Sequence, residues 1–224
     1  MKFCGLQKTS LVDFPDKMSS VLFTPGCNLR CPYCHNWRIV MNPKPPFLNE
    51  EAALKILEDR KRFVDAVVIT GGEPTIHREL PRFLKKLREK GFLVKLDTNG
   101  FNPRVLEESL PYVDYVALDI KTSLEKYAKL GASDTVQLLQ TIEMLKTGKV
   151  EYEFRTTVVP GFVDDADIGK ICELVKGARV LVFQQFISDD ILDKELKIQP
   201  YSPETITDFA NRMKGYAENV TLRV

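Results

Sequence analysis

Short apolar runs alternate with segments of helical apolar spacing along most of the chain. The apolar runs predict strands at residues 18–24, 64–70, 92–97, 112–119, 151–158, 178–186 and 219–224. The helical spacing predicts helices at residues 50–61, 78–90, 103–109, 134–147, 164–176 and 203–215. Asn49 is expected to cap the first helix, and Gly91 to end the second. Runs buried on both faces and joined by helical crossovers indicate an α/β fold with a parallel sheet.

The pattern contains six βα units, fewer than the eight that close a (βα)8 barrel. No internal repeat or low-complexity stretch interrupts it. A chain of 224 residues with this organisation predicts a single domain over residues 1–224. The proline-rich residues 42–46 are expected to be a stiff loop within that domain and not a boundary.

Polar and reactive residues lie at or near the ends of the predicted strands, except for Arg155, which lies within the fifth strand. In strand order they are the cysteines of residues 27–34, Gly71-Gly72-Glu73-Pro74, Asp97-Thr98-Asn99-Gly100, Asp119-Ile120-Lys121, Arg155 and Gln184-Gln185. An acid after a strand is most often a helix cap or a turn residue. Because the carboxyl ends of parallel strands share one edge of a sheet, however, so many such residues together predict a site at that edge.

Cys27, Cys31 and Cys34 have the spacing C-x3-C-x2-C. Three thiolates on one short loop can hold three irons of a [4Fe–4S] cluster and leave the fourth iron open to an exchangeable ligand. The alternative is a structural zinc site, which needs four ligands, usually as two pairs. Cys4 and Cys172 stand alone, and His35 directly follows Cys34, a spacing at which neighbouring side chains seldom share one tetrahedron. The spacing favours the cluster.

Composition narrows the class of protein. The net charge is +1 and the pI about 7.6, which indicates neither a nucleic acid nor an anionic membrane surface as partner. No apolar run approaches the roughly 18 residues of a membrane span, and the N-terminus lacks the shape of a signal peptide. An odd count of five cysteines, three of them within eight residues, does not suit a disulfide framework. We expect a cytoplasmic enzyme, because a reducing compartment preserves an oxygen-sensitive cluster.

The cysteine loop of residues 24–36, together with Gly71-Gly72-Glu73-Pro74, resembles the radical S-adenosylmethionine (radical SAM) superfamily. The N-terminal segment 5–16 and the sequence Cys31-Pro32-Tyr33-Cys34-His35-Asn36 are similar to the activating enzymes of glycyl radical enzymes. The nearest resemblance is to the anaerobic ribonucleoside-triphosphate reductase activating proteins, and the general pattern also resembles pyruvate formate-lyase activating enzyme. This resemblance implies an open partial (βα)6 barrel with a parallel six-stranded sheet.

The resemblance also implies a reaction. S-adenosylmethionine would chelate the open iron, and its reductive cleavage would give a 5′-deoxyadenosyl radical that removes hydrogen from a backbone glycine of a partner. That partner would be an anaerobic ribonucleotide reductase or, alternatively, pyruvate formate-lyase or another glycyl radical enzyme. A low-potential donor such as flavodoxin or ferredoxin would supply the electron. A radical SAM reaction on a small molecule, and an interaction module without turnover, are the other hypotheses that the sequence leaves open.

Individual roles carry over from the resemblance by position. The cluster ligands would be Cys27, Cys31 and Cys34, with Tyr33 beside the adenine and Gly71, Gly72 and Glu73 at the methionyl amine. Asp97, Thr98 and Asp119 match positions that bind a monovalent cation next to the cofactor, and Lys121 and Arg155 match positive residues near the carboxylate and ribose.

Gln185 and Asp16 differ from the family pattern, and Asp13 is expected to serve the substrate. Gln185 stands where the relatives have histidine, although an amide can still hydrogen-bond a ribose or adenine edge. Asp13 would position the incoming glycyl loop, and its alternative role is to cap the turn before Pro15. Asp16 occupies a position where glycine is usual, so the geometry of that turn is expected to differ.

Overall fold

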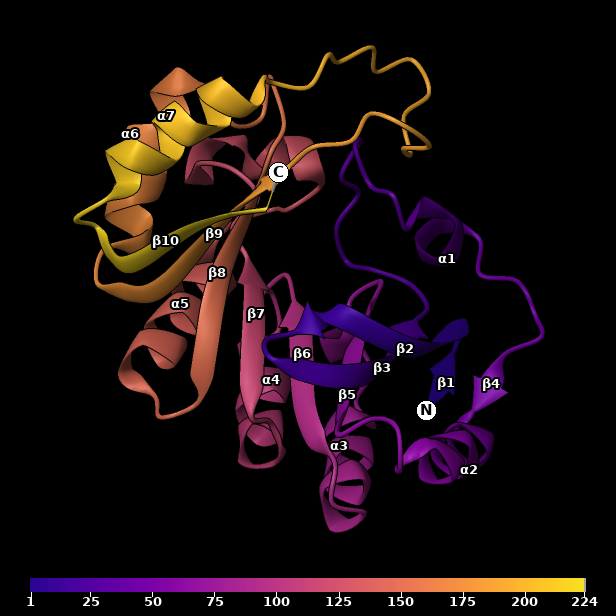
Figure 1. The fold of residues 1–224 in the computed structure, drawn as a ribbon. Helices are drawn as coiled ribbons and strands as arrows, with labels where there is room; N and C mark the ends of the chain where they lie inside the picture. Colours follow the sequence, from indigo (N-terminus) through magenta and orange to yellow (C-terminus); the bar gives the residue numbers. More distant parts are fainter. Residues whose placement is uncertain (224) are drawn as a thin grey trace. The chain divides into compact units, whose positions relative to one another are not determined.

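The computed structural model describes residues 1–223, whose backbone packs as two compact units (Figure 1). The first unit comprises Met1–Asn28 and Asn36–Val116. The second comprises Leu29–His35 and the chain from Ala117 onward. The division passes through the cysteine loop, so that Cys27 is grouped with the first unit and the other two cysteines of the loop with the second. A single domain over residues 1–224 stays a prediction.

Parallel strands form the centre of the first unit. The strands β3 (Lys17–Thr24), β5 (Ala66–Gly71) and β6 (Leu93–Thr98) pair in parallel, with Val21 opposite Val68 and Val67 opposite Val94. The strand β2 (Gly5–Phe14) pairs antiparallel with β3 and has two register shifts. A separate antiparallel pair is formed by β1 (Lys2–Phe3) and β4 (Leu48–Asn49).

The helices of the first unit follow its strands. They are α1 (Trp37–Met41), α2 (Glu50–Arg60), α3 (Leu80–Glu89) and α4 (Pro103–Ser109), with short 3₁₀ turns η1 (Pro74–Ile76) and η2 (Leu110–Tyr112). The Asn49 side chain accepts a hydrogen bond from Ala52 N at 2.8 Å, which confirms it as the cap of α2. The predicted stop of α3 at Gly91 is also confirmed, since Gly91 N bonds to Arg88 O at 2.8 Å.

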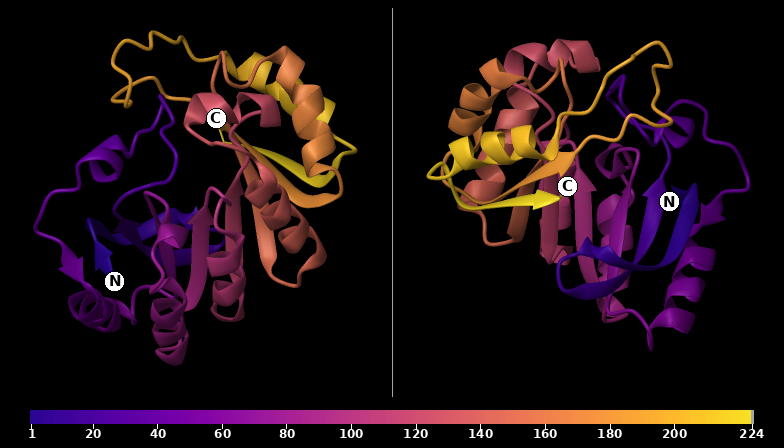
Figure 2. Two further views of the ribbon diagram at one scale, coloured as in Figure 1. Left: turned by 180° about the vertical axis from the view of Figure 1, so that it is seen from behind. Right: turned by 45° about the horizontal axis from the view of Figure 1, so that its top comes forward.

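The second unit repeats the alternation of strand and helix. The strand β7 (Tyr115–Asp119) begins at the end of the first unit, and β8 (Glu151–Val158), β9 (Ala178–Gln185) and β10 (Ala217–Arg223) pair in parallel in that order. The helical elements are η3 (Leu124–Leu130), α5 (Val136–Thr147), α6 (Asp165–Val175) and α7 (Pro203–Met213). Figure 2 shows α6 and α7 running alongside each other.

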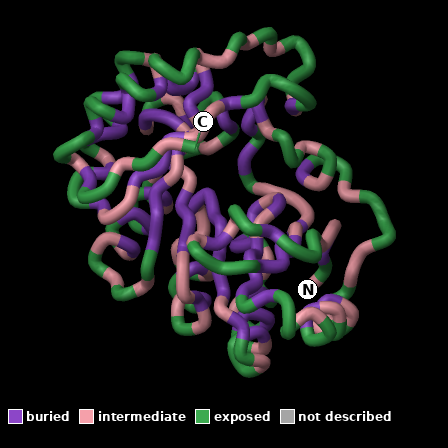
Figure 3. The backbone as a smooth tube through the Cα atoms, viewed as in Figure 1, coloured by how far each residue is buried: buried purple, intermediate pink, exposed green. Residues whose placement is uncertain are grey.

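Burial follows the apolar runs of the sequence. Residues 66–69 of β5 are fully buried, and the face of α3 formed by Leu80, Phe83, Leu84 and Leu87 is buried as well. Figure 3 shows buried backbone concentrated in the strands and exposed backbone in loops and on helix faces. The prediction of an α/β fold with a mostly parallel sheet is therefore confirmed. No helix within residues 1–223 is both long and apolar enough to cross a bilayer.

The structure differs from the sequence predictions in three places. Residues 5–14 were expected to precede the first strand, but they form β2, so Asp13 lies within a strand. Residues 37–41 form the short helix α1, which the sequence pattern did not predict. The final strand begins at Ala217 instead of residue 219, and Val224 lies outside the described residues.

Lys95 lies on β6 and is only 1 % exposed. Its ammonium group donates to the backbone carbonyl of Asp13, lies 3.5 Å from Asp97 Oδ1, and stands 5.7 Å from the centre of the Tyr115 ring. A buried charge is tolerated when it has such partners. Lys95 therefore connects the end of β2 with the end of β6.

We predict that Lys95→Met lowers the free energy of unfolding by about 3 kcal/mol, because it leaves the Asp97 carboxylate and the Asp13 carbonyl without this donor. Urea unfolding of the cluster-free protein measures the change. Lys85→Met is the matched control, since Lys85 is 55 % exposed and its ion pair with Glu89 spans 3.9 Å. Equal stabilities of the two variants would contradict the role given to Lys95.

Candidate functional site

The glycine pair after β5 packs directly against the start of the cysteine loop. Gly71 has a φ of +110°, and a Cβ there would lie 2.6 Å from Thr24 N. A Cβ on Gly72 would lie only 1.8 Å from the carbonyl oxygen of Gly26, the residue before Cys27. Both positions therefore require glycine, one for its backbone conformation and both for close approach.

Hydrogen bonds hold this contact together. Gly72 N donates to Thr24 O at 2.9 Å, and Glu73 N donates to Gly26 O at 2.8 Å. On the far side of the loop, the Asn36 amide donates to Gly71 O at 2.7 Å. Both ends of the cysteine loop, at residues 24–26 and at Asn36, are thus bound to the turn of residues 71–73.

Glu73 is 1 % exposed and accepts four hydrogen bonds. Its Oε1 accepts from Thr75 N at 3.0 Å, from the Thr75 hydroxyl at 2.6 Å and from the Thr98 hydroxyl at 2.7 Å, while Oε2 accepts from Asn99 N at 2.6 Å. Burial raises the pKa of Glu73, although these hydrogen bonds favour the ionised form. The carboxylate joins the start of η1 to the end of β6.

Asn99 lies in the Asp97-Thr98-Asn99-Gly100 sequence that was expected near the site, but no role was predicted for it. It is 4 % exposed, and its amide nitrogen lies 3.6 Å from Cys27 Sγ and 2.7 Å from Asn28 Oδ1. The only available signal was its place in the turn after a predicted strand. Asn99 connects the Glu73 carboxylate with the first cysteine of the loop.

The second unit contains the middle of the cysteine loop. Cys34 N bonds to Cys31 O at 3.1 Å, Arg30 N bonds to Leu130 O at 2.7 Å, and Asp193 N bonds to Pro32 O at 2.8 Å. These bonds attach residues 29–35 to the end of η3 and to the segment after β9.

Tyr33 is buried against two aromatic rings, with centroids at 5.0 Å for Phe162 and 6.3 Å for Phe186. Its hydroxyl donates to the carbonyl of Lys121 at 3.4 Å. Burial raises the pKa of Tyr33 well above its ordinary value. The residue is therefore a neutral aromatic wall beside the cysteine loop.

Asp119, Lys121 and Arg155 form an ion-pair triad. Arg155 Nε donates to Asp119 Oδ1 at 2.9 Å, and Lys121 Nζ donates to Oδ2 at 3.1 Å. Burial alone would raise the pKa of Asp119, but the charges of Arg155 and Lys121 outweigh it and lower the pKa from 3.8 to about 2. The pKa of Lys121 is raised well above its ordinary value, because its negative neighbours outweigh burial. The triad carries one more positive than negative charge.

The Gln185 side chain contacts backbone carbonyls, whereas the backbone of Asp13 contacts side chains. The Gln185 amide nitrogen donates to Phe186 O and Tyr201 O, both at 3.2 Å. Asp13 N donates to Ser10 Oγ at 3.3 Å, and the carbonyl of Asp13 accepts from Lys95. The cofactor role of Gln185 and the substrate role of Asp13 stay predictions.

The structure thus brings together two sets of predicted residues, one in each unit. In the first, Gly71, Gly72, Glu73 and Thr98 surround the start of the cysteine loop, and Asp97 pairs with Lys95. In the second, Tyr33 contacts Lys121, which pairs with Asp119 beside Arg155. The monovalent cation expected at Asp97, Thr98 and Asp119 stays a prediction.

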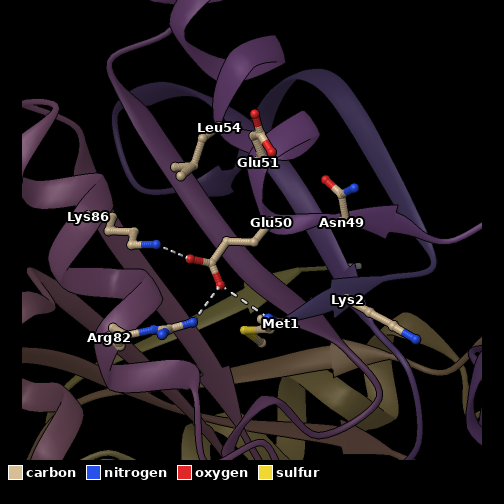
Figure 4. Close-up of a pocket in the computed structure, with 8 residues that line it drawn as sticks. All are labelled: Met1, Lys2, Asn49, Glu50, Glu51, Leu54, Arg82 and Lys86. Atoms are coloured by element: carbon tan, nitrogen blue, oxygen red, sulfur yellow. Dashed lines mark hydrogen bonds and ion pairs between the residues drawn. The ribbon is translucent and has the colours of Figure 1, made fainter.

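A pocket of the first unit lies apart from these residues (Figure 4). Its centre is Glu50, whose carboxylate contacts the amino group of Met1 at 3.1 Å, Arg82 at 3.5 Å, and Lys86. Burial raises the pKa of Glu50, but Lys86 and the Met1 amino group outweigh it and the net shift is downward. None of the predicted site residues lines this pocket.

The model of the radical SAM superfamily matches residues 21–175, which include the cysteine loop, the glycine turn and the ion-pair triad. The chain belongs to the radical SAM superfamily. Among curated proteins it is 38 % identical over 233 residues to MJ1227 of Methanocaldococcus jannaschii, whose name gives it as a glycyl-radical enzyme activating enzyme, covering 98 % of this chain and 94 % of that protein. It is 32 % identical over 179 residues to pyruvate formate-lyase-activating enzyme of Staphylococcus aureus, covering 73 % and 70 %.

Solved structures confirm the fold. TYW1 with a lysine-pyruvate adduct superposes with a TM-score of 0.66 at 21 % identity, covering 89 % of this chain and 74 % of that one. QueE from Escherichia coli gives 0.59 at 20 % identity, covering 87 % and 86 %. This radical SAM chain is accordingly an enzyme of the superfamily, with homologues among the activating enzymes.

Membership of the radical SAM superfamily implies a [4Fe–4S] cluster and S-adenosylmethionine. Three of the five cysteines share one loop, so the donor set fits a cluster with one open iron. Among the residues that the structure describes, no three Cys, His, Asp or Glu side chains form a preassembled metal site. Cys4 and Cys172, whose pKa values burial raises, lie outside the loop.

We predict that Gly72→Ala disrupts cluster assembly, because the new Cβ must push Gly26 and hence Cys27 out of place. Iron and sulfide content after anaerobic reconstitution should fall to less than half of the wild-type value. Gly169→Ala is the matched control, since a Cβ at that helical glycine has nothing within 4 Å. Full iron content in Gly72→Ala would show that the contact is not needed for assembly.

We also predict a pH-dependent contribution of Asp119 to stability. Because its pKa is lower in the folded state, the contribution is fully present above pH 3.8 and is lost as the pH falls toward about 2. A difference of nearly two pKa units corresponds to about 2 kcal/mol. The unfolding free energies of cluster-free wild type and Asp119→Asn, measured with urea, should therefore differ most at pH 5–6 and converge as the pH falls from 3.8 toward about 2. A gap that stays constant down to pH 2.5 would contradict the assignment.

Proposed function

We propose that this chain is a radical SAM activase that removes a hydrogen atom from a backbone glycine of a partner glycyl radical enzyme. The observation that carries the proposal is the 38 % identity over 98 % of the chain to a protein named for that activity. The structure supports it with a three-thiol loop held against a glycine turn and an adjoining buried carboxylate. The cluster ligands in this proposal are Cys27, Cys31 and Cys34.

When bound, the cluster and cofactor would supply one-electron cleavage of a sulfonium C–S bond and, through it, the power to remove a hydrogen atom. The chain's own residues bind and orient these groups. The turn at Gly71 and Gly72 fixes the position of Cys27. Glu73 holds the end of β6 in register with that turn.

In the second unit, the residues suit the other parts of the cofactor. The positive charge that Lys121 and Arg155 retain after pairing with Asp119 is suited to a carboxylate ligand. Tyr33 offers a buried aromatic face for a base, in keeping with its predicted place beside the adenine. The roles proposed for Gln185 and for a monovalent cation at Asp97, Thr98 and Asp119 rest on the resemblance of the sequence alone.

The partner that we propose is an anaerobic ribonucleotide reductase, on the resemblance of the N-terminal segment and the cysteine loop to its activating proteins. Pyruvate formate-lyase is the second candidate, supported by 32 % identity to its activating enzyme in Staphylococcus aureus. A flavodoxin or ferredoxin is proposed as the electron donor. Asp13 would position the glycyl loop, because both of its backbone polar groups are already held by Ser10 and Lys95, which leaves the carboxylate to interact with the substrate.

Anaerobic mixing with each candidate partner tests the proposal. The reconstituted and reduced protein, with S-adenosylmethionine, should produce a glycyl radical doublet by electron paramagnetic resonance on an anaerobic ribonucleotide reductase. Single Cys27→Ala, Cys31→Ala and Cys34→Ala variants should lose both the cluster absorbance and the doublet. Cys4→Ala and Cys172→Ala are the matched controls and should retain both.

Asp13→Asn separates substrate positioning from cofactor chemistry. It should reduce the doublet at least tenfold while leaving cofactor cleavage without partner nearly unchanged. A doublet only on pyruvate formate-lyase would replace the proposed partner. Cofactor cleavage without a doublet on any glycyl radical enzyme would contradict the activase function and favour a small-molecule substrate.

A further inference from the structure

Hydrogen bonds fix the Asn99 amide in an orientation that points its nitrogen toward Cys27. Its Oδ1 accepts a hydrogen bond from Phe101 N at 3.1 Å, and its backbone N donates to Glu73 Oε2 at 2.6 Å. Because the oxygen of the amide is bound by a backbone N–H, the nitrogen must face the opposite way. That nitrogen lies 2.7 Å from Asn28 Oδ1 and 3.6 Å from Cys27 Sγ.

The two amide hydrogens of Asn99 match these two acceptors. In the free protein, the Cys27 thiol also approaches Asn28 Oδ1, at 3.8 Å. A ligating cysteine loses its proton and is then only an acceptor. The contact from Asn99 thereby becomes an N–H···S bond to a thiolate, which is stronger than a bond to a neutral thiol.

We infer that Asn99 is a positioning residue that sets the reduction potential of the cluster through an N–H···S hydrogen bond to Cys27. This inference rests on the proposed [4Fe–4S] cluster. Reduction adds negative charge to the cluster and its thiolates, so a donor aimed at a thiolate sulfur stabilises the reduced form and raises the potential. The donor is rigid because Asn99 is buried and its backbone is bound to Glu73.

A redox titration of the reconstituted protein without S-adenosylmethionine tests the inference. The electron paramagnetic resonance signal of the reduced cluster measures the extent of reduction at each potential. Asn99→Ala should lower the ratio of reduced to oxidised cluster at a fixed solution potential by about tenfold, or about 59 mV for a one-electron couple. Asn99→Asp, which keeps the size and the acceptor for Phe101 N, should lower it further because it replaces the donor with a negative charge.

Asn102→Ala is the matched control. Asn102 lies three residues on, and its amide donates to Thr75 Oγ1 at 3.2 Å. This variant should keep the wild-type potential. A full cluster with unchanged potential in both Asn99 variants would overturn the inference. So would loss of the cluster from both, because Asn99 would then serve assembly and not reduction potential. Wild-type protein that binds no iron and sulfide would instead refute the proposed function.

Discussion

The carboxylate of Glu73 is buried in the first unit, and its oxygens need hydrogen-bond donors. The arrangement of the neighbouring strand ends follows from that need. An ionised carboxylate removed from water is stable only if its oxygens are hydrogen-bonded. The donors come from Thr75 at the start of η1 and from Thr98 and Asn99 at the end of β6. The ends of two neighbouring strands are therefore fixed together. Two contacts link Glu73 to Cys27. One is the hydrogen bond from the Glu73 backbone to Gly26, and the other is the Asn99 amide.

The sequence was sufficient to predict the parallel strands because their burial is nearly continuous. A strand such as β5, apolar along its length, leaves a pattern that no exposed segment produces. The strand β2 left no such pattern. Most of its residues are exposed or half-buried, and its register shifts break the alternation of apolar and polar positions. β2 is a strand because it pairs with β3 in the folded chain, and the local sequence of residues 5–14 does not show that pairing.

The candidate site was predicted as a set of positions but not as a set of contacts. Asp119 was predicted at the end of one strand and Arg155 within the next, yet 36 positions separate them, and only the folded chain shows that they form an ion pair. Gly72 was expected to serve the approach of a ligand, whereas the structure also requires it for the approach of Gly26. Asn99 lay inside a predicted turn, and side-chain direction within a turn depends on backbone dihedral angles that sequence spacing does not specify.

The triad of Asp119, Lys121 and Arg155 has a consequence for how ligand affinity responds to the medium. Two cations share one carboxylate, so a residual positive potential is fixed in a region of reduced dielectric. Mobile ions screen exposed charges over about 8 Å at physiological ionic strength but reach partly buried charges much less. An anionic ligand held there should lose little affinity as salt is added. The small loss of affinity that remains should come from slower association, because salt screens the attraction at long range, and not from faster dissociation.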